Sequence, residues 1–161
     1  SVLENVLAGC HCRMKSGILS SMFHFPLQQR EERAAIDRAL KALDFVGLRG
    51  QAESLSKNLS YGNQRLLEIA RALGTEPRLL VLDEPAGGMN ENETAQLVSL
   101  IERIRGMGIT VLLIEHDMSL VMRVCEQIVV LEYGSKIAEG SPEEIQRNER
   151  VIAAYLGTED G

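Results

Sequence analysis

Tryptophan is absent from the sequence, and only 4% of its 161 residues are aromatic. Side chains that stack on bases are therefore scarce, which disfavours recognition of nucleic acid by stacking. Three cysteines cannot all pair, so the sequence indicates no disulfide framework and fits a reducing cytosol best. We predict that Cys10 and Cys12 bind no metal, because two sulfurs one residue apart are a poor chelate and no second pair follows.

Long apolar runs and an excess of positive charge are also lacking. No apolar stretch approaches the ~20 residues of a membrane-spanning helix, and no basic segment followed by an apolar one indicates a secretion signal. The net charge is −6, from 23 acidic and 17 basic residues. This balance argues against nucleic acid as the main partner, because phosphate binding requires a surplus of Lys and Arg. The length suits one globular domain with a buried core.

The first part of the chain predicts helices joined by irregular loops. Apolar residues recur at helical spacing in residues 30–45 and 66–73, and residues 2–7 predict a further short helix. We therefore expect a helical part over residues 1–76.

The second part, residues 77–161, predicts strands alternating with helices. Three short apolar runs, at residues 79–82, 109–114 and 128–131, are typical of strands covered by helices on both faces. Tyr133 and Gly134 then predict the turn of a hairpin. The pattern indicates an α/β fold with a parallel core.

Polar residues predict where the helices of this second part begin. Asn90 and Ser141 are each followed three residues later by a glutamate, Glu93 and Glu144, which is the pattern of a capping box. Asp117 is a third predicted cap, for the helix after the second apolar run.

Two adjacent carboxylates, Asp83 and Glu84, follow the first apolar run directly. Ligands bind at the carboxyl ends of strands in open α/β sheets. A hard cation prefers oxygen ligands, so Asp83 is a candidate for holding Mg²⁺, and Glu84 is a candidate for orienting or deprotonating an attacking water. A solvated acidic turn at the end of a strand would produce the same motif.

A histidine, His116, follows the second apolar run. Neighbouring parallel strands would bring it to the same edge as Glu84, where it could donate a hydrogen bond to a phosphate oxygen. The alternative is an ordinary histidine of a loop.

Residues 59–65 open a predicted helix, with Ser60 as its cap and Gly62 permitting close approach to the backbone. The N–H groups at the start of a helix favour an anion, so this segment predicts an anion site. A capped helix start without a ligand is the alternative.

The order of these motifs resembles one protein family. Leu-Ser-Tyr-Gly-Asn-Gln, then Leu-Asp-Glu-Pro, then Glu-His-Asp are similar to the signature motif, Walker B motif and switch histidine of the ATPase subunits of ABC transporters. The resemblance covers essentially the whole chain. Residues 86–90 and 133–157 resemble the branched-chain amino acid importer group in particular, and urea and amide importers share much of this pattern.

The resemblance implies a fold, an activity and partners. The fold would be a partial P-loop NTPase, with a helical signature subdomain over residues 1–76 followed by the C-terminal part of a parallel-sheet, RecA-like catalytic subdomain over residues 77–161. The intact subunit would hydrolyse ATP to drive import of branched-chain amino acids. It would work with a second ATPase subunit, as a homo- or heterodimer, and with transmembrane permease subunits, at the cytoplasmic face of the inner membrane.

The resemblance also implies roles for individual residues. In this family two subunits enclose two ATP molecules, and the signature residues of one face the phosphates bound by the other. The roles implied here are phosphate binding by Ser60, Gly62 and Asn63, Mg²⁺ binding by Asp83, activation of water by Glu84, contact with the γ-phosphate by His116, and signalling across the dimer by Asn90. Asn63 departs from the Gln common in the signature, and Asn90 departs from the usual Asp, although the branched-chain group is similar there.

A P-loop is missing from these residues. The motif G-x-x-x-x-G-K-[ST] wraps phosphates in backbone N–H groups, but none of the four lysines follows a glycine. We therefore expect the chain to be the C-terminal part of a larger subunit, beginning just after the Q-loop and inactive alone. We also expect uncovered apolar strand residues around Leu80 and Leu112, and self-association through them.

Two further functions remain open from the sequence. A non-transport ABC ATPase would keep the same motifs, although the acidic charge and the lack of a coiled-coil insertion count against it. A non-enzymatic module that docks on a membrane subunit is the other alternative.

Overall fold

The computed structural model describes residues 1–10 and 26–156, so Cys12 and its predicted lack of a metal lie outside the described residues. The chain forms two compact units, unit 1 over Ser1–Leu112 and unit 2 over Leu113–Gly161. The predicted boundary at residue 76 concerned a change of sequence pattern, and it stays a prediction.

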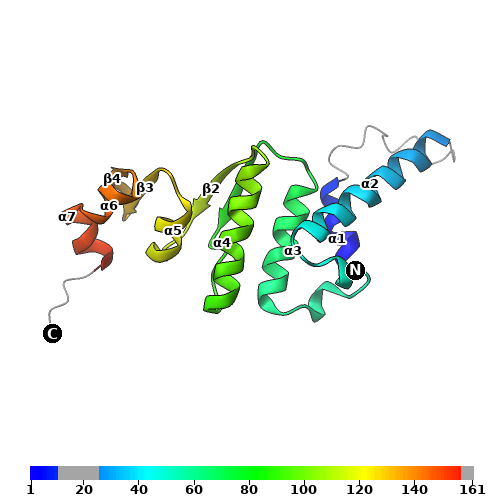
Figure 1. Cartoon of the computed structure of the whole chain (residues 1–161), viewed down its shortest axis with the longest axis horizontal. Helices are drawn as coiled ribbons and strands as arrows, with labels where there is room; N and C mark the ends of the chain where they lie inside the picture. The colour runs from blue at the N-terminus through cyan, green and yellow to red at the C-terminus, as the bar shows by residue number, and fades with distance from the viewer. Residues whose placement is uncertain (11–25, 157–161) are drawn as a thin grey trace. The chain divides into compact units, whose positions relative to one another are not determined.

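Three helices of unit 1 pack on one another: α1 (Val2–Cys10), α2 (Pro26–Phe45) and α3 (Tyr61–Leu73) (Figure 1). Two 3-10 turns, Arg49–Gln51 and Ser56–Asn58, lie between α2 and α3. The apolar sides of the helices are buried, with the lowest exposure at Val2, Val6, Ala39, Leu43 and Ala70. The three predicted helices are confirmed, and each extends beyond the predicted range.

The rest of unit 1 contains the first strand and the helix that follows this strand. Strand β1 (Leu79–Asp83) is hydrogen-bonded to β2 (Thr110–Ile114) in a short parallel sheet, and β2 runs across the boundary between the units. Helix α4 (Glu91–Gly106) lies between the two strands in the chain. Its apolar stripe is buried at Leu97, Leu100, Ile101 and Ile104.

The prediction that helices cover both faces of the three strands was wrong. Leu112 and Ile114 of β2 are 51% and 50% exposed, and Val129 and Leu131 of the third apolar run are 54% and 52% exposed.

In β1 the exposure alternates along the strand. Leu80 and Leu82 are 3% and 7% exposed, whereas Leu79 and Val81 are 53% and 52% exposed. Successive side chains of a strand point to opposite faces, so the described part of unit 1 covers only one face of this strand. The expected uncovered apolar residues around Leu80 are its neighbours Leu79 and Val81, and Leu112 of β2 is exposed as well.

Unit 2 contains α5 (Met118–Val124), the strands β3 (Ile128–Glu132) and β4 (Ser135–Gly140), and α6 (Pro142–Gln146), α7 (Glu149–Val151) and a π-helical turn, Ile152–Leu156. β3 pairs with β4 in an antiparallel hairpin. Tyr133 and Gly134 form its turn with φ of 47° and 79°, which is the backbone a tight hairpin requires. The hairpin is confirmed, and the third apolar run forms it instead of extending the parallel pair. The core of the unit consists of Val121, Ile128, Val130, Ala138, Ile145 and Val151.

The predicted helix caps are confirmed in both units. Asn90 and Glu93 form a reciprocal capping box, with both backbone-to-side-chain bonds at 3.0 Å. Ser141 and Glu144 form a second one at the start of α6. Asp117 caps α5. These short polar side chains pair N–H groups that the first turn of a helix leaves without a partner.

Among the described residues, no helix combines the length and the apolar character needed to cross a bilayer.

We predict that Cys10 reacts with a thiol reagent much more slowly than Cys125 in the folded chain. Cys10 is fully buried, whereas Cys125 is partly exposed. Burial also raises the pKa of the Cys10 thiol, which depletes the nucleophilic thiolate. In a Cys12→Ser variant these are the two remaining thiols, and mass spectrometry of a labelling time course separates them. Equal rates in urea are the control, and equal rates in the folded chain would contradict the burial of Cys10.

Candidate functional site

The predicted anion site lies at the start of α3 in unit 1. Ser60 is the N-cap, and its hydroxyl oxygen accepts the N–H of Asn63 at 3.3 Å. Gly62 is buried in the first turn of the helix, and Ser60 is exposed. The positive end of the helix dipole therefore lies at these residues, which favours a bound anion there.

Tyr61 is held in place beside this turn. Its hydroxyl accepts a hydrogen bond from Arg65 Nη2 at 2.8 Å, and the Arg65 guanidinium lies 5.1 Å from the centre of the ring. Arg65 Nη1 also donates to Glu68 at 2.9 Å. The ring is thus fixed from its own helix, with a cation on one side.

The two adjacent carboxylates lie where the sequence predicts them. Asp83 is the last residue of β1, and both Asp83 and Glu84 are exposed. Glu84 has a φ of 45°, in the left-handed region that side chains other than glycine rarely adopt. Its carbonyl accepts the N–H of Gly87 at 3.2 Å, which closes a turn. Backbone strain of this kind concentrates at functional sites, so it supports a functional hypothesis for Glu84.

The loop after Glu84 and the first turn of α4 both contact the start of α3. A Cβ atom on Gly62 would lie 2.6 Å from Glu93 Oε1, and one on Gly88 would lie 3.0 Å from Tyr61 Cε1. Asn90, the N-cap of α4, is hydrogen-bonded to the same Glu93. The structure therefore brings together two of the predicted site segments, the one with Gly62 and the one with Asn90.

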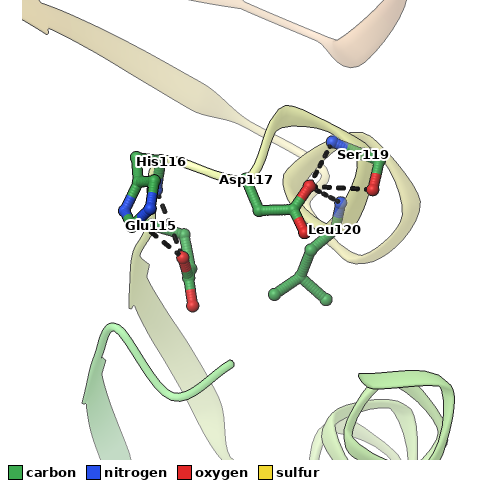
Figure 2. A network of polar contacts seen from close by, with 5 residues as sticks. All are labelled: Glu115, His116, Asp117, Ser119 and Leu120. Carbon is green, nitrogen blue, oxygen red and sulfur yellow. Dashed lines mark hydrogen bonds and ion pairs between the residues drawn. The ribbon is translucent and has the colours of Figure 1, made fainter. Parts of the chain in front are cut away.

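His116 belongs to unit 2 and follows β2, with Glu115 between the strand and the histidine. Its side chain is 72% exposed, whereas that of the preceding Glu115 is 2% exposed. Glu115 Oε2 accepts the backbone N–H of His116 at 3.2 Å and lies 4.0 Å from His116 Nδ1 (Figure 2). The buried carboxylate holds the backbone of an exposed imidazole. Placement of His116 beside Glu84 stays a prediction.

A magnesium ion at this site would take only some of its ligands from the protein. Among the described residues, no group of three or more His, Cys, Asp or Glu side chains is arranged to hold a metal. Mg²⁺ commonly takes one or two protein carboxylates and completes its shell with water and substrate phosphates. An exposed carboxylate at the end of a strand, such as Asp83, fits that kind of site.

Three residues of the site were not predicted as functional. Tyr61 and Glu115 were not singled out, although each directly precedes or follows a predicted site residue. Glu93 was predicted only as part of a capping box. Its contact with Gly62 joins segments that are distant in the sequence, and no local pattern signals such a contact.

Comparison with known proteins identifies the family. Residues 2–87, more than half of the chain, match the ABC transporter family, and residues 135–161 match the branched-chain amino acid ATP-binding cassette transporter family. The chain belongs to the ABC transporter family.

Individual relatives support the same assignment. The chain is 46% identical over 158 residues to the high-affinity branched-chain amino acid transport ATP-binding protein LivG of Salmonella typhimurium, and 45% identical over 158 residues to BraF of Pseudomonas aeruginosa, described by the same function. Both alignments cover 98% of this chain and 62% of the relative. The chain thus spans less than two thirds of the length of these curated relatives.

A solved structure confirms the predicted fold. An ATP-binding cassette of an ABC transporter, in its ADP conformation, matches with a TM-score of 0.78 and 31% identity. The match covers 98% of this chain and 63% of that one. The predicted partial ABC ATPase fold is therefore confirmed.

We predict that Asp117 contributes to the loss of stability of the folded chain as the pH falls into the acidic range. The Ser119 hydroxyl and the Leu120 N–H donate to this carboxylate (Figure 2), and they hold its pKa below the ordinary value. A lowered folded pKa stabilises the fold above the unfolded pKa of about 4, and this stabilisation is lost as the pH falls through the folded pKa.

Two variants test this prediction by urea unfolding at a series of pH values. Asp117→Asn keeps the capping oxygen but does not titrate, so its free energy of unfolding should fall less steeply with acid than that of the parent chain. Asp117→Ala should lose about 1 kcal/mol at neutral pH, the usual contribution of an N-cap. Parallel pH curves for the parent chain and Asp117→Asn would contradict the prediction.

Proposed function

We propose that this protein is the ATP-hydrolysing subunit of an ABC importer of branched-chain amino acids. One observation carries the proposal: the chain matches the ABC transporter family and has three motifs in a characteristic order. These are Ser60–Asn63, then Asp83–Glu84, then His116. The match of residues 135–161 to the branched-chain group and the 46% identity to LivG support the substrate class.

The start of α3 is proposed to act on the phosphates of ATP. In this proposal Ser60, Gly62 and Asn63 face a nucleotide bound by a second ATPase subunit. The capped helix start supports the role, because its N–H groups and its dipole favour a phosphate. Asn90, the cap of α4, is proposed to transmit the state of the site across the dimer.

The end of β1 is proposed to carry the hydrolytic chemistry. Asp83 would hold Mg²⁺, which when bound neutralises charge on the phosphates. Glu84 would orient the attacking water and accept its proton. The exposure of both carboxylates at the end of the strand supports these roles. His116 would donate a hydrogen bond to the γ-phosphate, with its backbone held by Glu115.

The partners and the location follow from the same proposal. The subunit would pair with a second ATPase subunit and dock on transmembrane permease subunits. It would lie on the cytoplasmic face of the inner membrane as a peripheral component. The LivG and BraF relatives are branched-chain amino acid transport ATP-binding proteins, which supports an association with a membrane transporter.

We predict that Glu84→Gln abolishes transport by the intact transporter. Glutamine keeps the shape of the side chain but removes the base, so ATP turnover should fall by about 100-fold or more while ATP still binds. The experiment measures ATP hydrolysis and uptake of radiolabelled leucine in vesicles that contain the reconstituted transporter. Glu102→Gln, at an exposed position of α4, is the matched control and should retain both activities.

Two outcomes would overturn the proposal. Near-normal turnover in Glu84→Gln would remove Glu84 from the role of base. Uptake of urea or an amide in place of leucine would overturn the substrate class.

We also predict that the 161-residue chain by itself neither binds ATP tightly nor hydrolyses it, and that it self-associates. None of its lysines stands in a P-loop motif, and the exposed apolar residues Leu79, Val81 and Leu112 favour association. Calorimetry with ATP and light scattering at high concentration measure the two properties. Micromolar ATP binding would contradict the first prediction, and a monomer would contradict the second.

A further inference from the structure

Two glycine contacts join the start of α3 to the segment that contains the loop after β1 and the first turn of α4. A Cβ atom on Gly62 would lie 2.6 Å from Glu93 Oε1 and 3.0 Å from Glu93 Cδ. A Cβ atom on Gly88, which has a φ of 73°, would lie 3.0 Å from Tyr61 Cε1. At either glycine a methyl group would force the opposite side chain to move, so the two segments fit each other closely.

Glu93 contacts both segments with one carboxylate. Oε2 accepts the backbone N–H of Asn90 at 3.0 Å, and the backbone N–H of Glu93 donates to Asn90 Oδ1 at 3.0 Å. The other oxygen, Oε1, is the atom beside Gly62. A shift of this side chain would therefore change the surroundings of Asn90 and Gly62 together.

A second contact, between Tyr61 and Gly88, joins the same two segments of unit 1. Arg65 holds the Tyr61 hydroxyl at 2.8 Å, and Glu68 holds Arg65 at 2.9 Å. The ring is therefore tied to α3, and its contact with Gly88 ties the loop to the same helix. Both contacts lie within unit 1 and involve only described residues.

We propose that Glu93 is a positioning residue that makes the start of α3 and the Asn90 loop move as one body. The inference rests on the proposed function, in which Gly62 and Asn90 act at the nucleotide site. In that setting, a change at the Asn90 loop reaches the phosphate-facing turn directly through the Glu93 carboxylate, within a single subunit.

A simpler explanation for the glycine at position 62 predicts a different result. If Gly62 served only to let a phosphate approach the backbone, Gly62→Ala would have the same effect whether or not Glu93 were present. If Gly62 acts through Glu93, the new methyl group pushes the carboxylate away from Asn90. Removing that carboxylate in Glu93→Ala leaves room for the methyl group, so the effect of Gly62→Ala should shrink in this background.

The first test is a double-mutant cycle on this chain, read by hydrogen exchange at single amides. Gly62→Ala and Glu93→Ala should each speed exchange at the Asn90 amide by about fivefold, the usual effect of losing one hydrogen bond. The double variant should exchange no faster than Glu93→Ala alone. Glu93→Gln keeps an oxygen that can accept from Asn90, so it should exchange within about twofold of the parent chain.

Unit 2 contains a matched control for loss of a capping box. Glu144 caps Ser141 in the same way, and a Cβ atom on the adjacent Gly140 would lie 2.6 Å from Glu144 Oε2. This contact is local in sequence. Glu144→Ala should therefore speed exchange near Ser141 and leave the Asn90 amide and the first turn of α3 unchanged.

The second test uses the intact transporter. Glu93→Ala should lower the kcat for ATP by about tenfold, because the site is displaced, with KM for ATP unchanged. Glu93→Gln should restore kcat, and Glu144→Ala should not alter it. A purely structural role for Glu93 would lower the amount of folded transporter without this split between kcat and KM.

The outcomes separate this inference from the proposed function. Equal effects of Gly62→Ala in the presence and absence of Glu93, by exchange at Asn90 and by kcat, would overturn the inference. Failure of Glu93→Gln to restore either property would also overturn it. Coupling in the exchange experiment together with normal turnover of Glu84→Gln would overturn the proposed function instead and leave the contact standing.

Discussion

Pairing the N–H groups at helix starts is the constraint on which the candidate site depends. The first turn of a helix leaves these groups without partners from the helix itself, and Ser60, Asn90 and Asp117 accept hydrogen bonds from them. Each of these caps lies within or next to a predicted functional segment. The polar residues that start the helices are thus also the ones that orient the loops where the candidate residues lie.

One of the strained backbone positions lies at the other part of the site. Glu84 adopts a left-handed φ directly after the exposed end of β1, a conformation that costs on the order of 1–3 kcal/mol. The following Pro85 is buried, and Gly87 donates to the Glu84 carbonyl. The burial of Pro85 and the hydrogen bond from Gly87 offset part of the cost of this backbone conformation.

Features that depend on local sequence could be predicted, whereas the apolar runs by themselves predicted the wrong coverage of the strands. The caps at Asn90, Asp117 and Ser141 and the Tyr133–Gly134 hairpin follow from short-range hydrogen bonding and backbone preferences, which a pattern of a few residues records. The exposure of Leu79 and Val81 does not follow from their apolar character. A continuous apolar run indicates only that both faces of a strand tolerate burial, whereas burial itself requires a neighbour on each face.

The capping box at Asn90 shows how the same local pattern gains a different consequence from its surroundings. Asn90 and Glu93 repeat the hydrogen bonds of Ser141 and Glu144, and in both boxes one glutamate oxygen would lie 2.6 Å from a Cβ atom added to a glycine. At Glu144 that glycine is Gly140, directly before the cap, so the contact stiffens only its own turn. At Glu93 the glycine is Gly62, on another helix, so the same side chain connects two segments of the candidate site. The same capping-box pattern occurs in both places. Packing alone decides that Glu93, and not Glu144, contacts a second helix.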